Sequence, residues 1–545
     1  MKTGIAGLDT VLDGGFLYHN SILLKGRPGT GKTTLGIQMI HSGAVQYGEP
    51  GIIVLFEQFP QQLYRDLASF NWNIEEVVNA RKIAVHFARI EDIATTNRVG
   101  EPPLVSQIHT MAEEIGARRI LVDGLSNFMH MLQTDEASRR TIVLKFINSI
   151  KSIGLTPILT AEAENEEGHV GFEEYLADSV VSLSNPAPKD STFQTRWLEV
   201  RKSRGQSHIR GRHPYKITER GIEVYPHLTP KLRETAPGTG DFGLVRVPSG
   251  VPGLDDLLGG GYTRGTSTIV AGMPGTFKTT LGAQFLAQGA EQDEPGSLLT
   301  LGENPEFLVK AMKGKGVDLA PHLENGRIAI RHYFPKAFYM DELLFGLERE
   351  VRERGTKRIV VDGINEIEHG IDDPATYKDF ISLFLSLFSR HDVTSLFIQK
   401  LDRFTANAPL TNVKYASMFD GIIYTGTIEI ESAVRKVISV LKMRGGAYVG
   451  DLREISCGAQ GLAVTDKFLG LSGILAGNPQ GQVKKRIEEV FQPLYFVRDF
   501  LEILRSSEMD EAQRQQILSN LLGEVGKLVE RLKEHFDIKG ELGKE

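Results

Sequence analysis

The chain contains a single cysteine, Cys457, among 545 residues, so it cannot form an intramolecular disulfide or a cysteine-based zinc or iron–sulfur site. It has no apolar run near the roughly 20 residues that a membrane-spanning helix needs, and its first residues contain no signal-peptide core. Positive charge is not in excess, because 62 Lys and Arg stand against 69 Asp and Glu, a formal net charge of −7. We therefore expect a cytoplasmic protein with no membrane-embedded part, whose overall charge does not favour nucleic acid.

The sequence repeats itself once. The segment TGIAGLDTVLDGGF at Thr3 returns as SGVPGLDDLLGGGY at Ser249, and GRPGTGKTT at Gly26 returns as GMPGTFKTT at Gly272, both at an offset of 246 (249 − 3 and 272 − 26). The segments ILVDG and EVRKSRGQSH of the first copy also return in order, as IVVDG and SVLKMRGGAY. With a length that favours two or three domains, this repeat predicts a first domain over 1–236, a second over 237–478 and a tail over 479–545. A stretch rich in Pro, Gly and Thr links the two copies.

Within each copy, short β-rich runs such as SILLKG and RRILVDG alternate with helix-like stretches. This alternation predicts an α/β fold with a mainly parallel sheet and helices on both faces. In the tail, apolar residues recur at spacings of three and four on either side of a break at SSEMDE, where Ser507 is a plausible helix N-cap. The tail is therefore predicted to form two amphipathic helices, as a helical hairpin or a coiled coil.

The first of the two GxPG segments matches the phosphate-binding loop pattern GxxxxGK[ST] without exception, after an apolar strand and before a helix. In such a loop, backbone N–H groups and the helix N-terminus surround phosphate oxygens, the lysine reaches the terminal phosphates and the hydroxyl binds Mg²⁺. We therefore predict an ATP and Mg²⁺ site, and we call this segment the first phosphate loop. Its candidate nucleotide-binding residues are Gly26, Pro28, Gly29, Thr30, Gly31, Lys32, Thr33 and Thr34.

The second phosphate loop departs from the pattern at Phe277, which stands in the place of the glycine before the lysine. A side chain there is expected to strain the loop or to block part of the pocket, because glycine adopts backbone angles that other residues avoid. Nucleotide binding is still predicted, with a degenerate structural remnant as the alternative. The candidate residues are Gly272, Gly275, Thr276, Phe277, Lys278, Thr279 and Thr280.

Carboxylates follow other apolar runs. Asp123 and Asp362 each end a strand-like run, where an aspartate facing the phosphate loop would hold Mg²⁺ together with Thr33 or Thr279; a simple turn is the alternative. Glu57 and Glu303 end the strand-like runs that follow each phosphate-loop helix. They are candidates for the carboxylate that activates the attacking water, with a solvated glutamate as the alternative.

Each copy has a lysine and an arginine two residues apart in a strand-like segment, Lys202 with Arg204 and Lys442 with Arg444. Alternate residues of a strand share a face, so each pair needs an anion to offset its repulsion. The γ-phosphate on a neighbouring subunit is the natural anion in an assembly of phosphate-loop proteins, and an exposed edge strand is the alternative.

Taken together, these motifs resemble the KaiC-like branch of RecA-type ATPases over roughly residues 3–465. The resemblance rests on both GLDxxLxGG segments, both phosphate loops, the aspartate strands, the TAE segment at Thr160 and the KSRGQSH and KMRG strands. It implies tandem RecA-like domains in a homohexameric ring with ATP between subunits. It also implies that Lys202, Arg204, His208, Lys442 and Arg444 contact the neighbour's phosphates. Long C-terminal helices in some relatives pair two rings, which makes a stacked double ring an expectation here.

The chain departs from the family at several positions. Each copy keeps one member of the family's Glu-Glu pair, because Gln58 replaces the second member and Gly302 the first. Of the two adjacent phosphoacceptors in the second domain, Ser417 survives as a candidate, while Ala416 occupies the other position. We therefore expect weak or altered second-domain activity, an uncertain serine/threonine autokinase, and no commitment to a circadian oscillator.

Three functional hypotheses remain open at this point. The first is a regulatory ATPase ring that couples its nucleotide state to a protein partner. The second is a DNA-handling motor of the RecA or helicase type, which needs basic loops; the first copy has AENEEGHVGFEE at that place, whereas the second has Lys400, Arg403 and Lys414. The third is a catalytically silent scaffold held together by nucleotide.

Overall fold

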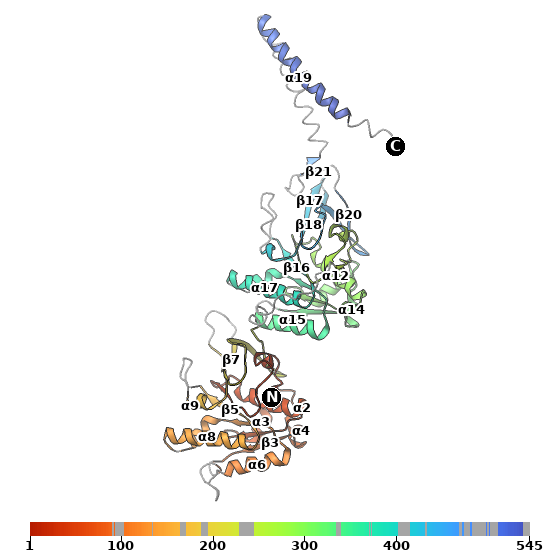
Figure 1. The fold of residues 1–545 in the computed structure, drawn as a ribbon. Coiled ribbons are helices and arrows are strands. Elements are labelled where there is room, and N and C mark those ends of the chain that lie inside the picture. The colour runs from red at the N-terminus through yellow and green to blue at the C-terminus, as the bar shows by residue number, and fades with distance from the viewer. Residues whose placement is uncertain are drawn as a thin grey trace. The chain divides into compact units, whose positions relative to one another are not determined.

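The computed structural model describes residues 1–89, 92, 103–132, 134–163, 171–186, 195–227, 245–333, 339–369, 371, 373–401, 415–430, 433–467, 471–472, 480–481, 498, 501 and 511–537 (Figure 1). The chain divides into two compact units, Met1–Ala236 with Ala337–Glu353, and Pro237–Lys336 with Arg354–Glu545. Among the helices of these residues, none combines the length and apolar character that a membrane span needs.

The first unit is built on a nine-stranded sheet with the strand order β3-β2-β4-β5-β1-β6-β7-β8-β9. The strands from β3 to β6 in this order pair in parallel, and β7 to β9 continue the sheet in antiparallel pairs. Their bounds are β1 (Ile22–Gly26), β2 (Gly51–Leu55), β3 (Ile83–Phe87), β4 (Arg119–Asp123), β5 (Thr156–Glu162), β6 (Ser179–Ser184), β7 (Arg196–Ser203), β8 (Arg212–Thr218) and β9 (Gly221–Val224).

Helices cover both faces of this sheet, so its central strands are buried along their whole length. Alternate residues of β2 show the two faces: Ile53 and Leu55 belong to one core cluster, and Ile52 and Val54 belong to another. The first cluster includes side chains of α1, α2, α3 and α4, and the second includes those of α6, α7 and α8. The helices are α1 (Leu8–Val11), α2 (Lys32–Gln46), α3 (Pro60–Leu67), α4 (Ile74–Asn79), α6 (Pro103–Ile115), α7 (Leu125–Met131), α8 (Glu136–Ser152) and α9 (Phe172–Leu176).

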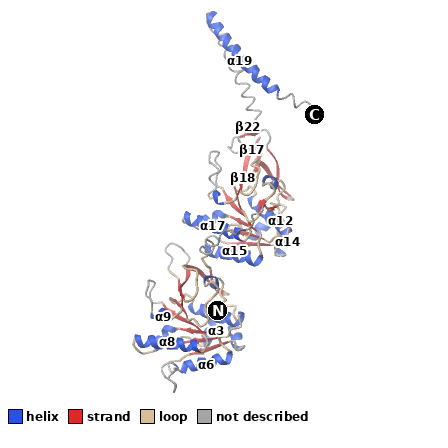
Figure 2. Cartoon of the chain, viewed as in Figure 1, coloured by secondary structure: helices blue, strands red, loops and turns tan. Residues whose placement is uncertain are grey.

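The second unit repeats the arrangement, as the red strands and blue helices of Figure 2 show. Its sheet has the order β14-β13-β15-β16-β12-β17-β18-β19-β20, which matches the first sheet strand for strand. The strands are β12 (Ser267–Gly272), β13 (Gly296–Thr300), β14 (Ile328–His332), β15 (Arg358–Asp362), β16 (Thr394–Lys400), β17 (Gly421–Ile430), β18 (Ala433–Met443), β19 (Arg453–Gly458) and β20 (Gly461–Lys467). The predicted fold class, two tandem RecA-like domains, is confirmed.

The remaining elements are short except for four long helices, α12, α15, α17 and α19. They are β10 (Arg246–Val247), α11 (Leu254–Leu257), β11 (Tyr262–Thr263), α12 (Lys278–Glu291), α13 (Pro305–Lys313), α14 (Ala320–Glu324), α15 (Met340–Arg354), α16 (Ile364–His369), α17 (Pro374–Arg390), the 3₁₀ helix η2 (Ala416–Met418), β21 (Leu471–Ser472), β22 (Gln480–Gly481) and α19 (Glu511–Asp537). Helix α19 covers the second amphipathic segment predicted for the tail. Ser507, most of the first tail helix and the linker before residue 245 lie outside the described residues, so the predicted hairpin and domain boundaries stay predictions.

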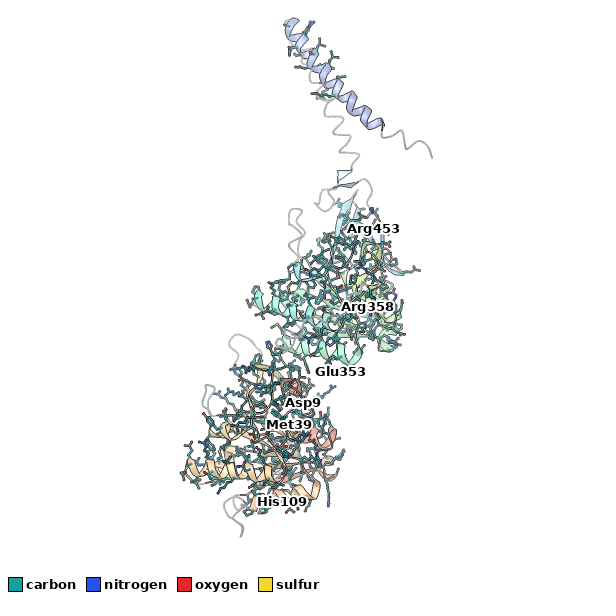
Figure 3. The ribbon with its side chains drawn as sticks, in the orientation of Figure 1. Asp9, Met39, His109, Glu353, Arg358 and Arg453 are labelled. Atoms are coloured by element: carbon teal, nitrogen blue, oxygen red, sulfur yellow. The ribbon has the colours of Figure 1, made fainter. Side chains whose placement is uncertain are left out.

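A buried arginine joins the phosphate-loop helix to the neighbouring strand in each unit. Arg119, at the start of β4, is fully buried; its Nε donates to Glu49 over 2.7 Å and its Nη1 donates to the Met39 carbonyl of α2 over 2.9 Å. Arg358, at the start of β15 and labelled in Figure 3, is its counterpart in the second unit. It donates in the same way to Glu294 and to the Phe285 carbonyl of α12.

Glycines bring each helix close enough for this contact. A Cβ at Gly43 would lie 2.6 Å from the Arg119 side chain, and one at Gly289 would lie 2.4 Å from that of Arg358. Gly36 and Gly282, one heptad earlier, meet Leu121 and Val360 in the same way. The register of each phosphate-loop helix on its sheet is therefore fixed at two levels.

We expect Glu49→Ala to lower the free energy of unfolding of the first unit by about 3–5 kcal/mol, because it leaves a fully buried guanidinium without its carboxylate. Trp72 and Trp197 are the chain's two tryptophans and both lie in the first unit, so their fluorescence in urea follows its unfolding. Glu294→Ala is the matched control and should leave this tryptophan transition in place. A shift below about 1 kcal/mol for Glu49→Ala would contradict the assignment.

Candidate nucleotide-binding sites

The first phosphate loop runs from the end of β1 into α2. Gly29 and Gly31 adopt left-handed backbone angles, with φ of 76° and 87°, as the tight turn requires. Gly26 faces the backbone of β6, where an added Cβ would lie 2.5 Å from the Leu183 carbonyl oxygen. The hydroxyl of Thr30 donates to the Arg27 carbonyl over 2.8 Å and closes the loop. The loop thus presents its N–H groups at the start of α2, as phosphate binding needs.

A hydroxyl and a carboxylate meet next to this loop. Thr33 Oγ1 lies 3.0 and 3.1 Å from the two carboxylate oxygens of Asp123, and Thr160 Oγ1, on β5, donates to Asp123 Oδ1 over 2.7 Å. Burial raises the pKa of Asp123, while the two hydroxyl donors act in the opposite direction. A threonine hydroxyl beside a carboxylate is the donor set that Mg²⁺ takes in phosphate-loop proteins, so these residues fit the predicted metal.

Three carboxylates surround Lys32. Burial lowers the pKa of Lys32, and the charges of Glu162, Asp123 and Glu57 act to raise it. Partial burial raises the pKa of Glu57, with further upward contributions from Asp123 and Glu162. The structure therefore places the charge of Glu57 close enough to act on Lys32, and its catalytic role stays a prediction. It adds Glu162, at the end of β5, to which we assigned no role from the sequence. The position of Glu162 could have been predicted from the sequence, because a residue that ends a parallel strand beside β1 lies at the same sheet edge as the loop.

Phe277 holds the second phosphate loop in the conformation that glycine has in the first. Its φ is 68°, in the left-handed region, against 87° for Gly31. The ring packs against the core cluster of the second unit, and Lys436 Nζ lies 3.6 Å from the ring centroid. The backbone strain that we predicted is thus present. The ring packs on the core and against Lys436, and a cation–π contact of this kind stabilises by about 0.5–1 kcal/mol in exposed pairs.

The lysine, threonine and aspartate of the second loop are arranged as in the first. Lys278 Nζ donates to the carbonyls of Gly272 and Met273 over 2.8 and 2.6 Å, and Thr279 Oγ1 donates to Asp362 over 2.8 Å. Burial lowers the pKa of Lys278 to about 8 and raises that of Asp362 to about 6. Ile398 takes the place in β16 that Thr160 has in β5, so Asp362 lacks the second hydroxyl donor that Asp123 receives.

Glu303 is exposed after the end of β13, and its charge contributes to the raised pKa of Asp362. The Thr300 hydroxyl accepts from the Glu303 backbone N–H over 3.2 Å and donates to the Glu303 carbonyl over 3.0 Å. This turn holds the Glu303 backbone, while the side chain is exposed. Glu303 therefore lies near the second site with Asp362 as a neighbouring carboxylate, whereas Glu57 has both Asp123 and Glu162 nearby, and its catalytic role stays a prediction.

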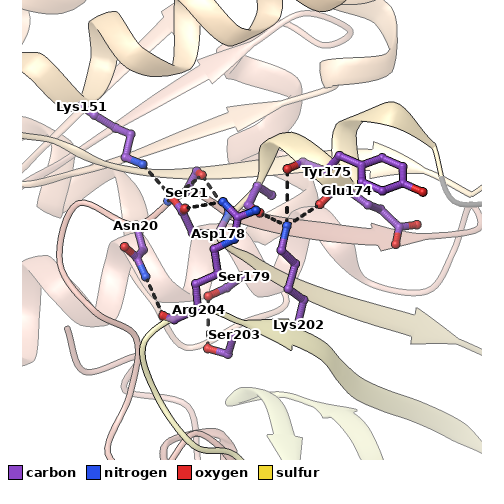
Figure 4. A network of polar contacts seen from close by, with 11 residues as sticks. Asn20, Ser21, Lys151, Glu174, Tyr175, Asp178, Ser179, Lys202, Ser203 and Arg204 are labelled. Atoms are coloured by element: carbon purple, nitrogen blue, oxygen red, sulfur yellow. Dashed lines mark hydrogen bonds and ion pairs between the residues drawn. The ribbon is translucent and has the colours of Figure 1, made fainter.

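The alternating cations of the first unit make contacts within the chain (Figure 4). Lys202 Nζ donates to the carbonyls of Glu174, Tyr175 and Ala177 at the end of α9, over 2.9, 3.4 and 2.6 Å. Arg204 lies 3.6 Å from Asp178, with 61% of its side chain exposed. Burial lowers the pKa of Lys202, and the charge of Arg204 lowers it further. We expected an anion from a neighbouring subunit next to these cations. For Arg204, Asp178 of the same chain supplies a negative charge.

The second unit repeats these contacts. Lys442 Nζ donates to the Phe419 carbonyl over 2.6 Å, and Arg444 lies 3.5 Å from Asp420. Arg444 also donates to the backbone carbonyl of Ser417 over 3.4 Å, and Ser417 itself is exposed in η2. His208 lies in the loop after β7 and is half-buried. Arg403 and Lys414, which kept a DNA-binding interpretation open, lie outside the described residues.

We expect Asp362→Asn to raise the free energy of unfolding of the nucleotide-free second unit. Burial raises the pKa of Asp362 in the folded state from 3.8 to about 6. The protonated side chain therefore does not destabilise the fold, whereas the loss of folding stability from the charged carboxylate grows as pH rises between these two values. The gain should reach about 3 kcal/mol at pH 7.5 and fall to about half of that at pH 5. Calorimetry at both pH values measures it, with exposed Asp256→Asn as the control; an equal effect of both substitutions would contradict the assignment.

Comparison with known proteins agrees with the geometry. A family model described as the KaiC ATPase matches the chain twice, over residues 1–229 and 247–466. The circadian clock oscillator protein KaiC of Synechococcus elongatus is 28% identical over 485 residues, which cover 88% of this chain and 91% of that protein. The KaiC of Prochlorococcus marinus is 27% identical over 486 residues, covering 88% and 95%. The circadian clock protein KaiC3 of Synechocystis sp. is 27% identical over 505 residues, covering 90% and 96%. Because the family model accounts for most of the chain in two consecutive copies, this protein belongs to the KaiC family of ATPases.

Proposed function

We propose that this chain is a ring-forming regulatory ATPase whose first domain carries most of the ATP hydrolysis. The observation that supports this most directly is the arrangement of Thr33, Asp123 and Glu57 around Lys32 in an intact phosphate loop. The second loop has the same lysine, threonine and aspartate, but Glu303 is exposed there with Asp362 as its neighbouring carboxylate, and Phe277 replaces a glycine. We propose that the second domain binds ATP mainly to hold or report a state.

In the proposed mechanism, the loop N–H groups and Lys32 bind the β- and γ-phosphates, and Thr33 with Asp123 holds Mg²⁺. When bound, the metal ion would supply positive charge to offset the charge that develops on the phosphate oxygens. Glu57 accepts a proton from the attacking water, and its raised pKa brings it closer to the range in which a carboxylate works as a general base near neutral pH. Glu57 and Glu303 keep the catalytic assignments made from the sequence.

The neighbouring subunit is proposed to supply cations to each nucleotide. Arg204 is better placed for this than Lys202, because most of the Arg204 side chain is exposed, while Lys202 donates to three carbonyls of its own chain. By the same comparison, Arg444 is proposed for the second site, with Lys442 holding the backbone beneath it. In the first unit, His208 completes the set.

The proposed assembly is a homohexamer, with a stacked double ring formed through the C-terminal helices and a regulatory protein as an additional partner. Ser417 remains the candidate phosphoacceptor for an autokinase activity. Its exposure and the nearby guanidinium of Arg444 are compatible with a phosphoserine at this position. Within the described residues no observation favours the DNA-motor alternative.

We expect Lys32→Ala and Glu57→Gln to lower the rate of ATP hydrolysis by about 10²- to 10⁴-fold, the range typical for loss of a catalytic base or phosphate-binding group. Lys278→Ala should keep most of the wild-type rate, because the second site contributes little turnover. Steady-state phosphate release measures all three. A wild-type rate no higher than that of the Lys32→Ala, Lys278→Ala double variant would leave only the silent scaffold.

The ring is tested by native mass spectrometry with and without ATP and Mg²⁺. We expect a sixfold mass with the nucleotide, because each site is completed by cations of the adjacent subunit, and twice that mass if the tail helices pair two rings. Phosphate mapping of the same sample then shows whether Ser417 is modified. A monomer that does not respond to ATP would exclude the ring.

A further inference from the structure

One position at the sheet edge carries opposite charges in the two units. Glu162 ends β5, and in the parallel register it pairs with Gly26, the first residue of the first phosphate loop. Lys400 ends β16 and pairs with Gly272, the first residue of the second loop. The strand orders β4-β5-β1 and β15-β16-β12 place this position between the loop and the metal-binding aspartate in each unit.

The backbone is held in the same way at both positions. The Glu162 N–H donates to Ser126 Oγ of α7 over 3.0 Å. The Lys400 N–H donates to Asn365 Oδ1 of α16 over 2.8 Å, and Asn365 Nδ2 donates back to the Lys400 carbonyl over 3.1 Å. Both side chains are exposed while the residue before each is buried. Glu162 and Lys400 therefore occupy equivalent positions in the two units. The backbone around them is held alike, and only the sign of the side-chain charge differs.

The two sites consequently have opposite electrostatic character. In the first, one lysine lies among Glu57, Asp123 and Glu162. In the second, Lys400 stands at the sheet edge beside the start of the loop that carries Lys278, where the first site has Glu162. Two ammonium groups in one site repel each other unless an anion lies between them. Because the position adjoins the metal-binding aspartate, the terminal phosphate of a nucleotide is the anion that belongs there.

We propose that Lys400 is a phosphate-binding residue of the second site, which together with Lys278 holds the terminal phosphate of a nucleoside triphosphate. The second site then prefers triphosphate to diphosphate and retains it. Glu162, at the same position of the first site, repels the phosphate and favours exchange after hydrolysis. The inference rests on the proposed binding of nucleotide by both domains and supplies a reason for their different roles.

The test uses the full chain with Lys32→Ala, which leaves the second site as the nucleotide-binding site. Binding of fluorescent ADP and of a fluorescent non-hydrolysable ATP analogue is measured with and without Lys400→Glu. A lost charge-assisted contact should weaken binding of the ATP analogue about 10- to 100-fold and change ADP binding much less. The affinity of the Lys400→Gln variant for the ATP analogue should lie between those of the chains with Lys400 and with Lys400→Glu. Lys378→Glu, the same charge change on the exposed side of α17, is the control and should have no effect.

The reciprocal change tests the same idea at the first site. In a Lys278→Ala chain, Glu162→Lys should strengthen binding of the ATP analogue and slow its exchange. Equal weakening of ADP and ATP-analogue binding by Lys400→Glu, or an effect no larger than that of Lys378→Glu, would overturn the proposal while leaving the second site as a nucleotide site. If the Lys32→Ala chain binds neither nucleotide, the proposed binding function of the second domain itself is wrong. Retained ADP binding shows that each variant is folded.

Discussion

Both nucleotide sites depend on how the phosphate-loop helix is seated against one strand of the sheet. At one end of β4, Arg119 donates to Glu49 and to a carbonyl of α2; at the other end, Asp123 accepts from Thr33 of the same helix. A shift of the helix by one residue would separate the hydroxyl from the carboxylate. Buried ion pairs add little net stability, because desolvation offsets their attraction. We therefore infer that this pair acts mainly by fixing the register that assembles the metal-binding residues.

The second unit repeats these contacts between the phosphate-loop helix and the sheet, which we call the frame, but differs in the side chains at the neighbouring strand end. Arg358 with Glu294, and Gly289 against Arg358, repeat the first unit's contacts, and Thr279 meets Asp362 as Thr33 meets Asp123. The strand next to the aspartate differs, because Ile398 replaces Thr160 and Lys400 replaces Glu162. The buried frame is therefore the same in both units, while the exposed ends of the strands differ.

The sequence was sufficient for the features that depend on local pattern. Asp123 and Thr33 were expected to meet because parallel strands end at one sheet edge and the loop pattern has a fixed spacing. The roles of Lys202 and Arg204 within the chain were not predictable, because Lys202 caps a helix some 25 residues earlier in the chain and Arg204 pairs with Asp178, and no periodicity shows either contact. Glu162 was missed because the TAE segment that it ends was used only for the family resemblance, whereas strand register places it beside the phosphate loop.

The electrostatics of the second site indicate that it is built around a ligand. Burial disfavours the charged form of both Lys278, whose pKa falls to about 8, and Asp362, whose pKa rises to about 6, so the protein alone compensates each charge only in part. An anionic phosphate next to Lys278 and a cation next to Asp362 restore both charges at once. Phe277 keeps the loop in its left-handed turn at a cost of about 1–2 kcal/mol, offset by its core packing and by Lys436. A loop held in the binding conformation before the ligand arrives loses less entropy on binding, which favours retention over turnover.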